Sequence, residues 1–257
     1  LGICDAEDLL PCRPAIPDVG KVVERAQLAN AIAQVRILSK PLLIHAAGGV
    51  GKTVFMDSLA SAVLDHSEVV FFDCFGGGAY RSPEDARHLP NKGLVHIANT
   101  LAFRGLCDPI LRDGTDVTCL LKTFRRRLVQ CVSTLETVAR GRDLALFIDA
   151  IDNAELFARE RSEKSFPILL LESLHHDPIS GVKLILSSRT ERKPSTHAHY
   201  QEFQLRPFST HETTAYLRPR LTNVSQAEIN VAQARSGGNP RVLEYLVKSG
   251  RGLLDES

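Results

Sequence analysis

A glycine-rich stretch that ends in a lysine and a threonine carries the clearest chemistry in this chain. It reads LLIHAAGGVGKT over residues 42–53, so an apolar run precedes the glycines and a helical pattern follows them. Glycines let backbone N–H groups turn inward around phosphate oxygens, and a helix that begins near Lys52 would point its positive end at the same anion. The pattern predicts a phosphate-binding loop in which Lys52 contacts the β- and γ-phosphates and Thr53 binds Mg²⁺.

The usual form of this loop has a glycine six residues before the lysine, where this chain has Ala46. Alanine is the smallest possible departure. A strand before the loop and a helix after it supply the context that the motif requires, which favours it over a chance glycine-rich turn. The residues expected to surround a bound nucleotide's phosphates are Ala47, Gly48, Gly49, Val50, Gly51, Lys52, Thr53 and Val54.

A second apolar run ends in carboxylates. Five apolar residues, LALFI, lead into Asp149, and Asp152 follows three residues later. Ligand sites of parallel sheets lie at the carboxyl ends of strands, so we assign Asp149 to Mg²⁺, through water, and Asp152 to polarising the attacking water. The alternatives are a strand-end turn for Asp149 and a helix N-cap for Asp152.

A third apolar run, VKLILSS, ends in Arg189, which could contact a γ-phosphate by charge-assisted hydrogen bonds. Further along, GGNPRV places Asn239 as a helix cap and Pro240 at the first helical position. Pro240 could stack on an adenine ring, and Arg241 could reach phosphate. The alternatives are a surface arginine at 189 and a plain helix cap with a solvated arginine at 241.

The elements that would position these residues alternate between strand and helix as far as residue 206. Apolar or β-branched runs predict five strands, at residues 41–45, 68–75, 144–149, 182–187 and 202–205. Helical spacing predicts helices at residues 22–38, 53–63, 94–103, 118–140, 165–175, 209–221, 226–234 and 240–248. Residues 1–20 read as an extended lead-in, and residues 76–92 as a polar loop. This alternation indicates an α/β fold with a mainly parallel five-stranded sheet flanked by helices.

Composition excludes several classes of protein. The 257 residues include 31 Lys and Arg against 30 Asp and Glu, so a net charge of +1 argues against a globally basic nucleic-acid binder. The apolar runs fall short of the roughly 20 residues that a membrane-spanning helix needs. The six cysteines show no C-x-x-C spacing and are interpreted as reduced thiols. We therefore expect a cytoplasmic protein; since Met56 is the only methionine, we also expect a piece of a longer chain.

Five segments, taken in order, resemble the STAND NTPases, a signal-transduction branch of P-loop ATPases that includes NACHT proteins. They are AAGGVGKT (46–53), LALFIDAIDNAE (144–155), LILSSRTE (184–191), FQLRPFSTHE (203–212) and GGNPRVLEYL (237–246). The resemblance implies a P-loop NTPase core at residues 1–206 and a C-terminal helical lid at residues 207–257.

In this family the lid proline, here Pro240, contacts the adenine, and the strand-end arginine, here Arg189, reads the γ-phosphate. The segment before the first strand, here with Val23 and Arg25, helps to cover the base. Asn153 stands where the family often has a glutamate, so the resemblance implies slow hydrolysis.

The expected function is an ATP-binding, slowly hydrolysing switch with Mg²⁺ as cofactor. It would couple ATP and ADP states to homo-oligomerisation and signalling in immune or antiviral defence. Sensor and effector domains would lie outside this chain, and neither a membrane nor a nucleic acid is an expected partner. The alternatives left open are an origin-recognition-like AAA+ ATPase acting on DNA, a small-molecule kinase and a nucleotide-binding pseudo-ATPase.

Overall fold

A computed structural model describes residues 9–12, 22–82, 85–111 and 116–249. Their strands form one sheet in the order β2-β3-β4-β1-β5, and every neighbouring pair is parallel. The strands are β1 (Leu42–Ala46), β2 (Ser67–Asp73), β3 (Asp143–Asp149), β4 (Val182–Arg189) and β5 (Gln201–Gln204). The sequence-based prediction of an α/β fold with a five-stranded parallel sheet is confirmed.

The register aligns the polar strand ends at one edge of the sheet. Ala46 lies opposite Arg189 on the β1–β4 pair, and Asp73 lies opposite Asp149 on the β2–β3 pair. Parallel strands share a direction, so the phosphate loop, the acidic strand end and the arginine strand end meet at this carboxyl edge.

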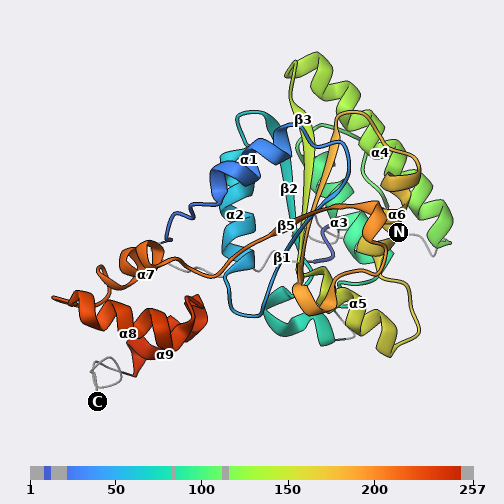
Figure 1. Cartoon of the computed structure of the whole chain (residues 1–257). Coiled ribbons are helices and arrows are strands. Elements are labelled where there is room, and N and C mark those ends of the chain that lie inside the picture. The colour runs from blue at the N-terminus through green and yellow to red at the C-terminus, as the bar shows by residue number, and fades with distance from the viewer. Residues whose placement is uncertain (1–8, 13–21, 83–84, 112–115, 250–257) are drawn as a thin grey trace.

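Helices cover both faces of the sheet (Figure 1). One face packs against α1 (Leu28–Arg36) and α2 (Lys52–Ala62), whose buried apolar residues form a core with Leu42 and Ile44. The other face packs against α3 (Pro90–Phe103), α4 (Val117–Val138) and α6 (Phe166–His176), together with Leu43 and Leu146. Side chains alternate along a strand, so Leu42 and Leu43 enter opposite cores.

Three further helices form a separate group beside the sheet (Figure 1): α7 (Thr210–Leu217), α8 (Gln226–Ser236) and α9 (Pro240–Lys248). Their own apolar core contains Phe208, Leu217, Ile229, Ala232 and Leu243. Serine begins α7 and α8 in the same way, because Ser209 with Glu212 and Ser225 with Glu228 each form a capping box.

Several boundaries differ from the sequence-based prediction. The helix predicted from residue 22 begins only at Leu28, because Val23 packs against the C-terminal helices whereas Ala31 and Val35 pack against the sheet. The predicted polar loop at residues 76–92 contains a 3₁₀ turn, Gly76–Arg81, and its last residues already belong to α3. Of the predicted lead-in at residues 1–20, only residues 9–12 are described.

The segment after β3 forms a helix that the sequence analysis did not assign. This helix, α5 (Ile151–Glu160), is capped by Ala150 in the left-handed region at φ 56°. Asp152 lies inside the first turn of α5, so its alternative interpretation as an N-cap is wrong. The early start of α5 turns Asp152 back toward the end of β4, where it lies near Arg189.

Candidate nucleotide-binding site

The predicted phosphate loop joins β1 directly to α2. Gly49 and Gly51 have φ values of 80° and 91°, in the left-handed region that only glycine adopts without strain. No side chain caps the first turn of α2, which leaves its N–H groups for an external acceptor. Helix N-termini of this kind bind anions, because their exposed N–H groups and the helix dipole both favour negative charge.

Lys52 folds back over this loop. Its Nζ donates to the carbonyl oxygens of Ala46, at 2.9 Å, and Ala47, at 3.1 Å. Burial lowers the pKa of Lys52, while the nearby carboxylates of Asp152 and Asp149 oppose that shift. The ammonium therefore lies at the mouth of the loop, facing the two predicted acidic residues. Val54 follows in the first turn of α2, half-buried behind the loop.

The two predicted Mg²⁺ ligands are in direct contact. Thr53 Oγ1 donates to Asp149 Oδ2 at 2.6 Å, and Ser187 Oγ donates to the other oxygen of Asp149. Ser187 also accepts from the N–H of Ala150 at 2.9 Å. Burial raises the pKa of Asp149, which is 1% exposed, and the hydrogen bonds from Ser187 and Thr53 oppose that shift.

Sequence analysis did not single out Ser187. The available signal was a serine at the end of an otherwise apolar predicted strand, because a hydroxyl buried there needs a hydrogen-bond partner.

Asp152 faces two arginines. The Nε of Arg189 lies 3.5 Å from Asp152 Oδ2, and the Nη1 of Arg192 lies 3.9 Å from the same oxygen. This oxygen is buried and has no hydrogen-bond partner in the described part of the chain. Burial raises the pKa of Asp152, and the charges of Arg189 and Lys52 oppose that shift. Oδ2 of Asp152 is thus held by ion pairs and not by a hydrogen bond, and Arg192 is an additional cation that the sequence analysis missed.

A third carboxylate, at the end of β2, was also missed. Asp73 is 4% exposed and lies next to Asp149 in the sheet register. It accepts hydrogen bonds from the N–H groups of Phe75 and Gly76, both at 2.7 Å. Burial raises its pKa to about 6, and the N–H of Phe75 opposes the shift. The run VVFFD has the same apolar-then-acidic pattern as β3, which was the available signal.

The start of α9 lies on the phosphate loop. Asn239 caps the helix as predicted, by accepting from the N–H of Arg241 at 3.0 Å, and its Nδ2 donates to the carbonyl of Gly48 at 2.9 Å. The backbone N–H of Arg241 donates to the carbonyl of Gly49 at 3.3 Å. A Cβ on Gly49 would lie only 2.8 Å from Asn239 Oδ1, and one on Gly51 would lie 3.9 Å from Pro240 Cγ. Pro240 and Arg241 therefore lie beside the predicted phosphate-binding residues.

Arg25 approaches the loop from the other side. Its Nη1 donates to the carbonyl of Val50 at 3.2 Å, and its guanidinium lies 4.7 Å from the ring centre of Phe208. Val23 packs with the C-terminal helices. In this structure the Arg25 guanidinium contacts protein groups, and the role of Val23 and Arg25 in covering a base remains a prediction.

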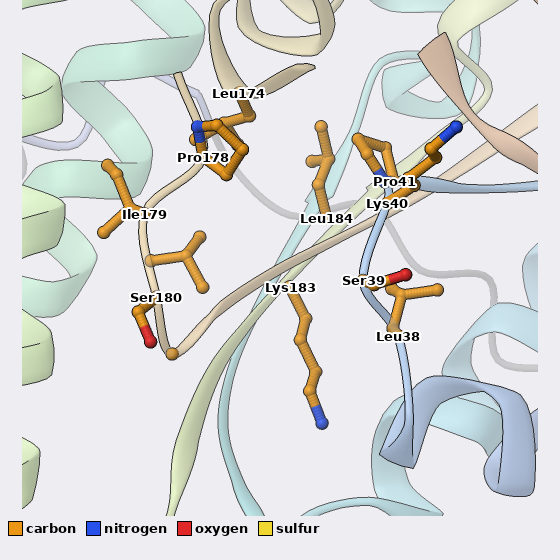
Figure 2. Close-up of a pocket in the computed structure, with 12 residues that line it drawn as sticks. Leu38, Ser39, Lys40, Pro41, Leu174, Pro178, Ile179, Ser180, Lys183 and Leu184 are labelled. Atoms are coloured by element: carbon orange, nitrogen blue, oxygen red, sulfur yellow. The ribbon is translucent and has the colours of Figure 1, made fainter. Parts of the chain in front are cut away.

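Among the residues that the structure describes, no group of three or more His, Cys, Asp or Glu side chains could hold a metal ion, and the described cysteines are free. No described helix combines the length and apolarity needed to cross a membrane. A pocket of about 230 Å³ lies at the opposite, amino edge of β1 and β4, between residues 38–41 and residues 178–184, and it contains none of the predicted site residues (Figure 2).

Comparison with known proteins agrees with this geometry. The model of the NACHT domain matches residues 40–223. The chain belongs to the NACHT family. The NACHT match covers β1 to β5 and includes the phosphate loop, both predicted Asp residues of β3–α5 and Arg189. A comparison with curated proteins finds no match.

Solved structures similar to this NACHT chain share its fold at low identity. The Walker-type ATPase paby2304 of Pyrococcus abyssi gives a TM-score of 0.60 at 16% identity, covering 96% of this chain and 73% of that one. The STAND protein PH0952 of Pyrococcus horikoshii, which has a tetratricopeptide repeat sensor, gives a TM-score of 0.52 at 15% identity. The match covers 94% of this chain and 31% of that one. The ORC2 protein of Aeropyrum pernix gives a TM-score of 0.52 at 14% identity, and the match covers 92% of this chain and 68% of that one. This chain thus spans less than a third of the Pyrococcus horikoshii protein.

Proposed function

We propose that this NACHT module binds ATP and ADP with Mg²⁺ and hydrolyses ATP slowly, as a nucleotide-dependent switch. The observation that carries the proposal is the contact between Thr53 and Asp149, 2.6 Å across, at the mouth of a phosphate loop on which α9 directly lies. A hydroxyl and a carboxylate suit Mg²⁺, which takes oxygen ligands and completes its shell with water and substrate phosphates. Such a Mg²⁺ site needs only one or two protein ligands, so the absence of larger carboxylate or histidine clusters among the described residues does not conflict with it.

Each side chain has a defined task in this proposal. Lys52 would leave its loop carbonyls to neutralise phosphate charge, and Thr53 with Asp149 would hold the metal, which offsets charge on the phosphates. Asp152, whose buried Oδ2 accepts no hydrogen bond from the described residues, would accept a proton from the attacking water. Arg189 now pairs with Asp152, so a γ-phosphate that attracted Arg189 would release Asp152 for this task.

The switch would act through the C-terminal helices, which we interpret as a lid. Asn239 and Arg241 contact the phosphate loop, so a nucleotide that favours one lid position shifts the population of lid states. We further propose that the ATP state of the full-length protein forms a homo-oligomer. In this proposal sensor and effector domains flank the module, and the protein signals in the cytoplasm in immune or antiviral defence, as the motif resemblance implies.

The test is isothermal titration calorimetry with ATP and ADP on Lys52→Ala. Loss of the charged contact to phosphate should weaken binding by about 100-fold. Lys40→Ala is the matched control, because Lys40 lines the pocket at the opposite edge of the sheet. Wild-type affinity in Lys52→Ala would overturn the proposal, whereas equal losses in both variants would indicate a general effect on folding.

A further inference from the structure

The buried carboxylate of Glu212 has two separate sets of partners. One oxygen closes the capping box of α7, where it accepts from the N–H of Ser209 at 2.7 Å. The other oxygen accepts from the Nε of Arg25 at 3.2 Å and from the N–H of Ala26 at 3.0 Å. Although burial opposes ionisation, the N–H groups of Ser209 and Ala26 and the charge of Arg25 hold the pKa of Glu212 below its usual value. Glu212 therefore ties α7 to the segment before α1.

Arg25 extends this connection to the phosphate loop. While its Nε binds Glu212, its Nη1 donates to the carbonyl of Val50 and its Nη2 donates to the carbonyl of Arg206. The side chains of Arg25 and Glu212 are both 7% exposed. Removing one partner of such a pair leaves an uncompensated buried charge, so the position of Arg25 depends on Glu212.

Three consecutive carbonyls of the phosphate loop are held by groups outside the loop. Gly48 O accepts from Asn239 Nδ2, Gly49 O accepts from the N–H of Arg241, and Val50 O accepts from Arg25. In a trans peptide the C=O and the following N–H point in opposite directions, and the described chain contains no cis peptide. The N–H groups of Gly49, Val50 and Gly51 must therefore point away from the C-terminal helices and Arg25.

Within the described part of the chain, none of these three N–H groups makes a backbone hydrogen bond of good geometry. Successive backbone N–H groups that face one side form a concave site for anions. Fixing their orientation beforehand removes an entropy cost that a flexible glycine loop would otherwise pay on binding. The C-terminal helices and Arg25 thus prepare the loop for phosphate by holding its carbonyls on the other side.

We infer that Glu212 is a positioning residue for the phosphate site: through Arg25 it holds the peptide between Val50 and Gly51, and so couples the C-terminal helices to phosphate affinity. This inference rests on the proposed function, because it assigns a nucleotide phosphate to the loop. Glu212 itself lies outside the phosphate loop and contacts Arg25, Ala26 and Ser209. It makes the affinity of the loop depend on where α7 lies, which gives the switch a physical connection between lid position and nucleotide.

The experiment compares Glu212→Gln with Glu228→Gln in the whole chain. Both residues close a serine capping box on a C-terminal helix, but Glu228 belongs to α8 and is only half-buried, whereas Glu212 is buried. Dissociation of a fluorescent ADP analogue is followed by stopped flow. Loss of a charged hydrogen-bonding partner predicts about tenfold faster dissociation for Glu212→Gln, and a change within twofold for Glu228→Gln.

Amide hydrogen exchange at saturating ADP supplies a readout that a purely structural role would not move, because the N–H groups of Gly49, Val50 and Gly51 gain protection only where they donate to phosphate. Peptides covering residues 46–55 should exchange faster in Glu212→Gln, while peptides of β3 keep wild-type protection and report an intact core. Wild-type dissociation and exchange in Glu212→Gln would overturn the inference and leave the proposed function standing if Lys52→Ala loses binding. Undiminished binding in Lys52→Ala would instead remove the proposed function.

Discussion

The hydroxyl of Thr53 donates to the carboxylate of Asp149 across 2.6 Å, which joins the phosphate loop after β1 to the end of β3. These two residues are 96 positions apart in sequence. Strand β4 lies between β1 and β3 in the sheet, and its Ser187 supports Asp149 from that side. A metal held between a hydroxyl and a carboxylate would therefore bind across the middle of the sheet edge.

The Thr53 contact predicts a specific defect in metal dependence. Thr53→Ala removes the hydroxyl ligand, so the gain in ATP affinity on adding Mg²⁺ should shrink by about tenfold. Calorimetric titrations with Mg²⁺ and with a chelator measure this gain. Thr53→Ser keeps the hydroxyl and should behave like the wild type; equal Mg²⁺ dependence in all three proteins would contradict the assignment.

Asp152 should matter for turnover much more than for binding. Asp152→Asn removes the proposed proton acceptor, so kcat should fall by about 100-fold or more, while the dissociation constant for ATP stays within about threefold. Phosphate release measures kcat. Glu155→Gln is the control on the same helix, because Glu155 pairs with Arg159 and should keep its turnover. Unchanged turnover in Asp152→Asn would remove Asp152 from the chemistry.

Asp73 predicts a pH dependence of stability in the nucleotide-free protein. Burial raises the pKa of this carboxyl from 3.8 to about 6, so the fold favours its neutral form. The stabilisation is fully present below pH 3.8 and is lost as pH rises through about 6. From pH 4 to pH 7, the wild type should lose roughly 2 kcal/mol relative to Asp73→Asn.

Urea unfolding of both proteins at several pH values measures this difference. Asparagine cannot reproduce both hydrogen bonds that Asp73 accepts, but that cost is the same at every pH and cancels in the comparison. Parallel pH profiles for the two proteins would show that Asp73 does not titrate in this range.

Two adjacent glycines before α9 offer a matched pair of substitutions. Gly237 and Gly238 both have positive φ, 56° and 72°, so alanine is strained at either position. A Cβ on Gly238 would also lie 2.1 Å from the carbonyl oxygen of Phe208, whereas a Cβ on Gly237 would meet nothing within 4 Å. Gly237→Ala should cost about 1 kcal/mol, and Gly238→Ala should cost about 3 kcal/mol.

Urea unfolding measures the loss of stability in each variant, and limited proteolysis measures how readily a protease cleaves within residues 207–249. Gly238→Ala should also expose the C-terminal helices, because the N–H of Phe208 donates to the carbonyl of Gly238 at 2.7 Å. Equal losses in the two variants would show that backbone strain alone, and not the contact with Phe208, decides the outcome.

Local patterns were sufficient to predict the strands, the fold class and the order of the motifs. An apolar run followed by glycines, by Asp149 or by Arg189 identifies a strand end from neighbouring residues alone. The same reasoning failed for Val23, which has helical spacing with Ala31 and Val35 but packs against a different part of the molecule. Periodicity records that a residue is buried, and does not tell which surface buries it.

The sequence by itself was enough to predict a phosphate loop, a strand-end carboxylate and a strand-end arginine, because each of these motifs consists of neighbouring residues. Only the tertiary structure decided which of them touch. The strand order placed Asp73 on one side of Asp149 and Ser187 on the other, and the docking of the C-terminal helices brought Glu212 to Arg25, 187 positions away. Such contacts depend on burial and charge between distant segments, which no local spacing encodes.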